Sequence, residues 1–218
     1  LQQVPLFYKL NEKQLGHIAN ICTVQKVKAG TVLFREKEPG SVFYIVQSGS
    51  VKLFLSSQTG EEKILSVFNS GDSFGELSLL DGKPRSGSAQ TLEDSVMIVL
   101  GGNGFLDLLK SNFDITLCIM QELAQRLRDT NQHVHDLTFL DARSRVVKNL
   151  ILLANKNGVR HGMTIHVKIA LNFDEIARMA GVQKTVLMQV MRDLEERGVI
   201  GVSMNEFTLY LDRLRAGG

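Results

Sequence analysis

Short apolar runs separated by glycines dominate residues 23–100, where Val, Ile, Phe and Thr are frequent. The runs expected to be strands are 42–46, 50–55, 63–68 and 95–99. Turn-forming glycines recur about every ten residues between them, which predicts an antiparallel sandwich or barrel. A short helix from Leu10 to His17 and beyond precedes this region, with Asn11 as its candidate cap.

The hydrophobic period becomes helical from residue 104 to residue 137. Seam positions alternate four and three residues apart: Phe113, Leu117, Met120, Ala124, Leu127, Asn131 and Val134. This spacing is typical of a helix that pairs with another helix along its length. The alternative is a single stripe packed on the preceding sheet. Asn131 favours self-pairing, because one polar seam residue sets the register at a cost in stability, and we expect a parallel homodimer.

The last third of the chain alternates helices with short strands. We expect a helix over 142–155, a basic glycine-containing link over 156–162 and a strand over 164–168. Asn172 and Glu175 have capping-box spacing and open a helix that ends at Gly181. A second helix is expected over 183–197, followed by a hairpin of 199–202 with 207–211.

The two helices around Gly181 have the pattern of a helix-turn-helix. Small residues at Ala177 and Gly181 permit a close crossing, and the buried face of the second helix is Leu187, Val190, Met191 and Leu194. The opposite face, expected to meet DNA, presents Gln183, Lys184, Thr185, Met188, Gln189 and Arg192. Its N-terminal end would reach base edges in the major groove. The alternative is an amphipathic helix pair without this purpose.

Composition narrows the class of protein. A length of 218 residues suits two modest domains, and 44% hydrophobic with 22% charged residues is typical of a soluble globular protein. No apolar run approaches the roughly 20 residues of a membrane helix. Two cysteines, Cys22 and Cys118, are too few for a disulfide framework. A cytoplasmic protein without a membrane partner is the simplest interpretation.

Charge is unevenly distributed. Residues 1–137 hold 13 Lys and Arg against 15 Asp and Glu, whereas residues 138–218 hold the remaining 12 against 8. This asymmetry fits a sensor joined to a polyanion binder. The five histidines lack metal-ligand spacing, and no nucleophile stands with a base in a pattern that indicates an enzyme. We therefore expect neither a metal site nor enzymatic activity.

The segment 74–89 carries the strongest functional signal. Gly75 lets backbone amides approach a ligand and form an anion nest, Arg85 adds a fork matched to phosphate, and Ser86 adds a hydroxyl. Glu76 would repel a phosphate, so we expect it to face a ligand hydroxyl with a cation elsewhere to balance it. A small anion that carries hydroxyls is the predicted ligand. The alternative is a surface turn with an ordinary Glu–Arg pair.

This segment resembles the phosphate-binding cassette of cyclic-nucleotide-binding domains. The whole chain resembles the cyclic-AMP receptor protein and fumarate–nitrate regulator family of bacterial transcription factors. The resemblance implies an α+β fold: a jelly-roll-like cyclic-nucleotide-binding β-roll (1–108), a dimerisation helix (109–138) and a winged helix-turn-helix (139–218).

The resemblance also implies roles for individual residues. Gly75, Leu77 and Ser86 would line the phosphate, Arg85 would neutralise it, and Glu76 would take the ribose 2′-hydroxyl. Further along, Arg126 is the candidate balancing cation for Glu76. Thr130 falls where a hydroxyl meets the adenine amino group, and Asn131 falls where the partner subunit adds a polar contact. One departure is Gly87, where such cassettes usually have Ala.

The expected function is a dimeric transcription factor gated by cyclic AMP, with residues 137–141 as a hinge. Its partners would be a double-stranded operator with two-fold symmetry and, by resemblance, RNA polymerase. Gln183-Lys184-Thr185 and Gln189 differ from the usual family reading residues, so we expect an unusual operator, richer in A·T. Alternatives are the same fold sensing cyclic GMP, a haem-bound gas or another small anion, and a ligand-binding module acting on a protein partner. The histidine spacing disfavours haem.

Overall fold

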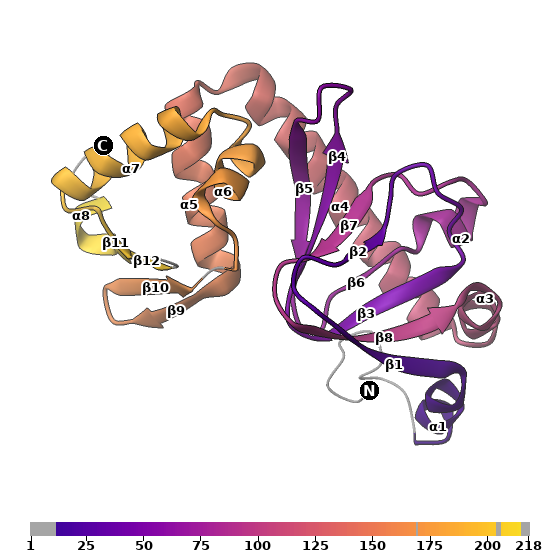
Figure 1. The fold of residues 1–218 in the computed structure, drawn as a ribbon. Coiled ribbons are helices and arrows are strands. Elements are labelled where there is room, and N and C mark those ends of the chain that lie inside the picture. Colours follow the sequence, from indigo (N-terminus) through magenta and orange to yellow (C-terminus); the bar gives the residue numbers. More distant parts are fainter. Residues whose placement is uncertain (1–11, 169, 204–205, 215–218) are drawn as a thin grey trace. The chain divides into compact units, whose positions relative to one another are not determined.

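The computed structural model describes residues 12–168, 170–203 and 206–214 (Figure 1). Contacts within the chain divide it into two compact units, Leu1–Thr130 and Asn131–Gly218. The three-part division of the chain at 108 and 138 stays a prediction. The candidate cap Asn11 lies outside the described residues, and helix α1 is described over Glu12–Ile21.

Two four-stranded antiparallel sheets build the described part of the first unit. One has the order β1 (Cys22–Val27), β8 (Ser95–Gly101), β3 (Val42–Ser48), β6 (Ser73–Phe74). The other has the order β2 (Val32–Phe34), β7 (Ser88–Thr91), β4 (Val51–Ser56), β5 (Glu62–Phe68). The four expected strands are therefore confirmed as β3, β4, β5 and β8, and together the sheets form the predicted β-roll.

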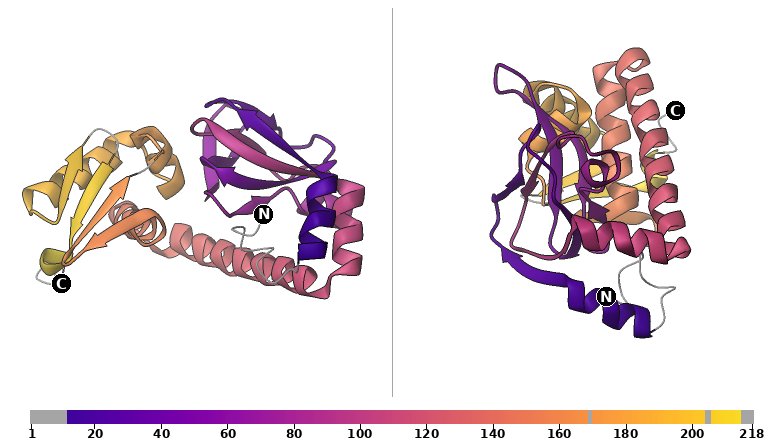
Figure 2. Two further views of the ribbon diagram at one scale, coloured as in Figure 1. Left: turned by 90° about the horizontal axis from the view of Figure 1, so that it is seen from below. Right: turned by 90° about the vertical axis from the view of Figure 1, so that its right-hand side faces the viewer.

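Strand β3 shows how the core is layered. Phe43 and Ile45 point to one side of the sheet, and Tyr44 and Val46 point to the other, because successive side chains of a strand alternate. Tyr44 and Val46 join the cluster between the two sheets, which also contains Phe34, Phe68 and Phe74. Phe43 and Ile45 pack against buried residues of helices α1, α3 (Gly102–Ser111) and α4 (Phe113–Phe139). These helices lie on the outer side of the sheet (Figure 2). Both faces of β3 are therefore buried.

Two helices, not one, follow the last strand of the β-roll: α3 (Gly102–Ser111) and α4 (Phe113–Phe139). Asn112 separates them in an extended conformation, at φ −136° and ψ 93°, and its side chain donates to the carbonyl of Leu108. Ile115 and Ile119 are the α4 residues buried against the β-roll. All seven seam positions are instead exposed, with Phe113 at 74% and Leu127 at 62%. The alternative that the seam packs on the sheet is therefore wrong.

The second unit contains helices α5 (Ala142–Asn157), α6 (Phe173–Ala180), α7 (Lys184–Glu196) and α8 (Leu211–Leu214). Its antiparallel sheet has the order β11 (Ile200–Ser203), β12 (Glu206–Tyr210), β10 (Thr164–Lys168), β9 (Gly158–His161). The expected hairpin is confirmed as β11 with β12, whereas the turn residues 204–205 lie outside the described part. The basic segment expected to be a link contains strand β9, which pairs with β10.

Helix α5 packs against α6 and α7, and the winged helix-turn-helix is thereby assembled. Both the helices and the sheet contribute buried residues to its core: Val146, Leu150, Val167, Ile176, Leu187 and Phe207. Across the described ranges, no helix combines the length and apolar character needed to cross a bilayer.

Candidate functional site

The chain turns sharply at Gly75, where φ is +88°. A Cβ atom there would lie 2.9 Å from Nη1 of Arg85 and 3.2 Å from the carbonyl oxygen of Val42. Glycine is thus required both for the left-handed backbone and for the close approach of Arg85. A short helix, α2 (Leu77–Asp81), follows and ends at Gly82, with φ +68°. The sequence pattern of segment 74–89 did not predict this helix.

Arg85 is buried beneath that turn, with 4% of the residue exposed. Its Nη1 donates to the Gly75 carbonyl and its Nη2 to the Val42 carbonyl, each at 2.8 Å. Burial lowers the pKa of the guanidinium from its ordinary value. The Nε–H group is also buried and has no hydrogen-bond partner among the described residues. Arg85 therefore has a fixed position, and its buried Nε–H group is available to a further acceptor.

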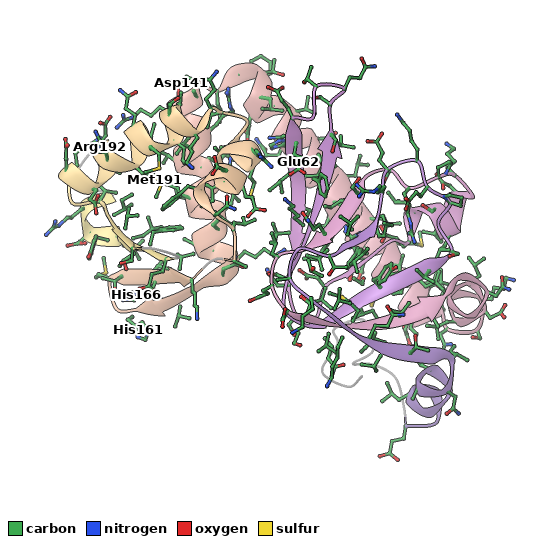
Figure 3. All side chains as sticks on the ribbon, in the orientation of Figure 1. Glu62, Asp141, His161, His166, Met191 and Arg192 are labelled. Carbon is green, nitrogen blue, oxygen red and sulfur yellow. The ribbon has the colours of Figure 1, made fainter. Side chains whose placement is uncertain are left out.

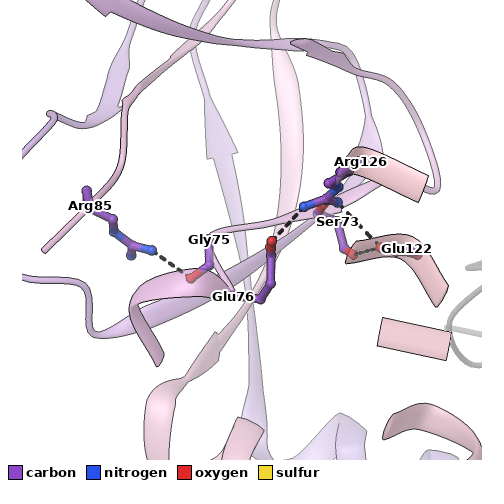
Figure 4. Close-up of polar contacts among 6 residues, drawn as sticks. All are labelled: Ser73, Gly75, Glu76, Arg85, Glu122 and Arg126. Atoms are coloured by element: carbon purple, nitrogen blue, oxygen red, sulfur yellow. Dashed lines mark hydrogen bonds and ion pairs between the residues drawn. The ribbon is translucent and has the colours of Figure 1, made fainter. Parts of the chain in front are cut away.

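Glu76 and Arg126 form an ion pair, with Nη1 2.7 Å from Oε1 (Figure 4). The Glu76 side chain is only 4% exposed. Arg126 also donates to the carbonyl of Ser73. The second carboxylate oxygen of Glu76, Oε2, is buried and has no hydrogen-bond partner within the described chain. The structure thus brings Arg126 to Glu76, as the sequence predicts, and leaves one acceptor of Glu76 available for a donor.

A second carboxylate, Glu122, lies one helical turn before Arg126. Ser73 Oγ donates to its Oε2 at 3.1 Å, and Arg126 Nη2 lies 3.4 Å from the same atom. Burial raises the pKa of Glu122, and the negative charges of Glu76 and Asp72 add to the rise, although Arg126 and Ser73 oppose it. Sequence reasoning missed Glu122, and its i,i+4 spacing to Arg126 is the signal that could have found it.

Aromatic rings support both arginines. The Arg85 guanidinium lies 4.2 Å from the ring centroid of Phe34, and that of Arg126 lies 5.1 Å from the ring centroid of Phe68. Phe74 contacts both rings, at centroid distances of 6.1 Å and 5.0 Å. A row of three buried rings therefore fixes the spacing of two cations, each stabilised further by the face of its ring.

The remaining predicted ligand residues are more exposed. Leu77 and Ser86 are exposed, and so are Thr130 and Asn131 on α4. The Thr130 hydroxyl donates to the carbonyl of Arg126 at 2.8 Å. A Cβ atom on Gly87 would lie 3.2 Å from the Phe54 carbonyl oxygen, so glycine suits the close approach of residue 87 to β4.

The helix-turn-helix is built by its caps and its turn. Asn172 Oδ1 accepts from the Glu175 amide at 3.0 Å, and Glu175 Oε2 accepts from the Asn172 amide at 3.1 Å, which completes the predicted capping box. Gly181 ends α6 with φ +65°. The predicted core residues of α7 are buried: Leu187, Val190, Met191 and Leu194.

The six residues expected to meet DNA are all exposed: Gln183, Lys184, Thr185, Met188, Gln189 and Arg192. Met191 and Arg192 mark the buried and the exposed side of α7 (Figure 3). Gln183 is the N-cap residue, with extended backbone, and not the first helical residue. Lys184 Nζ lies 2.7 Å from Asp174 Oδ2 of α6, a pair that the sequence pattern did not reveal.

Arg145 of α5 fixes the turn between the two helices. Its Nε donates to the Ala180 carbonyl and its Nη2 to the Gly181 carbonyl, each at 3.1 Å. Its Nη1 donates to the carbonyl of Leu140, within the expected hinge, at 2.8 Å. One guanidinium therefore links the residue that follows α4 to the end of α6, where a cation also offsets the helix dipole.

The first half of the chain matches a family model described as cyclic nucleotide-binding domain, over residues 24–112. A CRP-like cAMP-activated global transcriptional regulator of Mycobacterium tuberculosis is 33% identical over 171 residues, which cover 78% of this chain and 76% of that protein. The chain belongs to the CRP/FNR family. The resemblance that the cassette indicates is thereby confirmed.

Other relatives also align with this chain over most of its length. The cyclic AMP receptor protein of Thermus thermophilus is 30% identical over 196 residues, covering 90% of this chain and 88% of that protein. The solved structure of the c-di-GMP-responsive global regulator CLP from Xanthomonas campestris matches with a TM-score of 0.77 at 22% identity, covering 92% of this chain and 99% of that one. The last likeness confirms the α+β fold. The names of the two sequence relatives agree with the expectation that the chain is not an enzyme.

Proposed function

We propose that this protein is a homodimeric transcription regulator gated by cyclic AMP, which binds between the β-roll and α4. The observation that carries the proposal is the state of Glu76. Its carboxylate is buried, one oxygen is paired with Arg126, and the other has no partner among the described residues. A buried acceptor left without a donor costs free energy, on the order of 1–3 kcal/mol, which a ligand hydroxyl would recover.

The cassette supplies the complementary chemistry for a cyclic phosphate. Gly75 opens the backbone, Ser86 offers an exposed hydroxyl, and Arg85 holds a permanent positive charge close beneath the turn. A ribose 2′-hydroxyl would donate to Oε2 of Glu76, while Arg126 stays paired with Oε1 of the same carboxylate. The ligand class is therefore a monoanion that carries a hydroxyl near its phosphate.

Thr130 favours adenine over guanine. A hydroxyl has one proton to donate, and Thr130 donates it to the Arg126 carbonyl, so only its lone pairs remain. The amino group of adenine is a donor and suits those lone pairs, whereas guanine presents a carbonyl oxygen at the corresponding position. Two relatives at 30% identity or above are named for cyclic AMP, and they support the same choice.

The exposed seam of α4 supports the homodimer. Large apolar side chains rarely remain in water as a continuous stripe on a stable protein, and a second copy would bury Phe113, Leu117, Met120 and Leu127. The exposed face of α7 then supplies one reading surface per subunit. Gln189 suits adenine and Thr185 suits a thymine methyl, in an operator with half-sites about one helical turn apart. DNA and RNA polymerase are the proposed cytoplasmic partners.

Calorimetric titration tests the effector directly. The wild type is titrated with cyclic AMP, cyclic GMP and c-di-GMP, and Arg85→Leu is compared with Arg35→Leu, which alters an exposed arginine of the neighbouring loop. We expect cyclic AMP to bind tightest and only Arg85→Leu to abolish it. Ser86→Ala, at an exposed site, should weaken binding while the fold stays intact by circular dichroism. Tighter binding of either guanine nucleotide would reject cyclic AMP as the effector.

Selection from random DNA tests the output. With cyclic AMP present, we expect enrichment of a sequence with two-fold symmetry, and binding that weakens steeply with salt. A salt-insensitive signal without sequence preference would instead support the protein-partner module. Recovery of the usual family half-site would reject the prediction of an A·T-rich operator.

A further inference from the structure

We propose that Asp174 is a specificity-determining residue for DNA binding, because it holds Lys184 in an ion pair at the leading end of the recognition helix. This inference rests on the proposed function. Lys184 is the first residue of α7, and its Nζ lies 2.7 Å from Oδ2 of Asp174 in the first turn of α6. Both side chains are about half exposed, at 53% and 49%, so DNA would reach the pair as well.

The pair controls much of the positive charge on the reading face. Of the six exposed residues expected to meet DNA, only Lys184 and Arg192 are cationic. A lysine paired with a carboxylate contributes little net attraction to the phosphate backbone, and backbone attraction is the sequence-independent part of DNA binding. Asp174 therefore weakens attachment to arbitrary DNA.

A sequence-specific contact can compensate Lys184 for the loss of its ion pair with Asp174. A base edge with two acceptors, such as the O6 and N7 atoms of guanine, offers Lys184 hydrogen bonds that replace its pair with Asp174. A site without such acceptors leaves the lysine with the carboxylate. The ion pair therefore favours binding sites whose bases can replace Asp174 as the partner of Lys184.

Asp174 also lies where an acidic residue stabilises a helix N-terminus. That alone does not account for its contact with Lys184. The cap hydrogen bonds of α6 are made by Asn172 and Glu175, and not by Asp174. A purely structural role predicts that removal of Asp174 lowers both stability and DNA affinity, whereas the specificity role predicts that non-specific affinity rises.

The test uses the full chain with cyclic AMP, a duplex of arbitrary sequence, and the operator obtained by selection from random DNA. Asp174→Asn should raise affinity for the arbitrary duplex by about eightfold per subunit near 0.1 M salt, and steepen the salt dependence by about 0.9 per subunit. The ratio of specific to non-specific affinity should fall. Asp94→Asn is the control, because it breaks another exposed Lys–Asp pair, Lys28–Asp94 at 2.6 Å, in the β-roll unit.

A double-mutant cycle assigns the effect to the pair. In the Lys184→Met background, Asp174→Asn should change non-specific affinity far less than in the wild type. If Asp174→Asn behaves like Asp94→Asn while the wild type binds DNA, the inference is wrong and the proposed function stands. The inference is equally wrong if the effect persists without Lys184. Failure of the wild type to bind any duplex at low salt would overturn both.

Discussion

Glu76 and Arg126 lie 50 residues apart in the chain and form an ion pair of 2.7 Å, with the carboxylate nearly excluded from solvent. The pair joins the cassette to α4, so the long helix is part of the candidate pocket even before a second subunit is present. A buried charge of this kind is retained only if its partner stays in place.

Arg126→Gln should therefore destabilise the first unit by about 1–3 kcal/mol, because it leaves the Glu76 charge buried and unpaired. We expect cyclic AMP affinity to fall at least about tenfold, since the remaining carboxylate would repel the phosphate. Urea unfolding and calorimetry measure the two effects. Arg128→Gln, two residues along and fully on the exposed side, should change neither. Equal behaviour of both variants would contradict the role of the pair, and Glu76→Gln should restore part of the stability in the Arg126→Gln protein.

Gly75→Ala should cost more stability than an ordinary glycine at positive φ. The left-handed backbone alone costs about 1–2 kcal/mol for alanine, and crowding against Arg85 and Val42 should add about 1–3 kcal/mol. Gly60→Ala isolates the first effect, because Gly60 has φ +83° and nothing within 4 Å of the added Cβ. Thermal unfolding of the two variants gives the difference. Equal losses would mean that Arg85 moves away at no cost.

Glu122→Gln should alter the pH dependence of stability. The pKa of Glu122 is raised by burial, so the folded state favours the neutral carboxyl. Its favourable contribution is present below the ordinary carboxyl pKa and is lost as pH rises through the raised value. Glutamine cannot ionise, so the variant should be more stable at pH 7, by less than about 1 kcal/mol because the side chain is 36% exposed. The free energies of unfolding of the wild type and of Glu122→Gln, measured across pH, should converge in acid. A difference that stays constant with pH would contradict the raised pKa of Glu122.

Leu127→Asp should separate the proposed homodimer. Loss of two buried leucines, one per subunit, removes about 3 kcal/mol, which weakens association by about two orders of magnitude. Leu65→Asp is the control, because Leu65 is an exposed leucine of β5 outside the seam. Light scattering coupled to size exclusion over a dilution series gives the association constant. A dimer unchanged by Leu127→Asp would place the interface elsewhere.

The sequence was most informative where apolar residues form a continuous run or recur at a regular spacing. Strands β3 and β8 were predictable because each is a short apolar run, mostly buried in the structure. The seam of α4 was predictable because its apolar residues recur every three and a half positions on average. Strands β6 and β7 were not, because β6 has two residues and β7 reads Ser-Ala-Gln-Thr, with little apolar content. They become strands only because the sheets are already in place beside them.

The residues of the candidate sites likewise fall into those that were found from the sequence and those that were missed. Gly75, Glu76 and Arg85 stand in one ordered segment and were found from the sequence, and the charge of Glu76 alone indicated a distant cation. Glu122 and the pair Asp174–Lys184 were missed, because each depends on how two elements pack. The hydrogen bonds from Arg85 to two backbone carbonyls could not be inferred either. Every residue has a backbone carbonyl, so the residue type does not indicate which one accepts.

Arg126 and Leu127 are consecutive residues of α4, yet one is tied to Glu76 and the other is a seam position in water. Adjacent side chains on a helix differ in direction by about 100°, and their backbone is covalently continuous. A ligand that moved Arg126 by rotating α4 about its axis would turn Leu127 through the same angle. In the proposed function, sensing and assembly would then both follow from a single helix rotation, without a relay of intervening side chains.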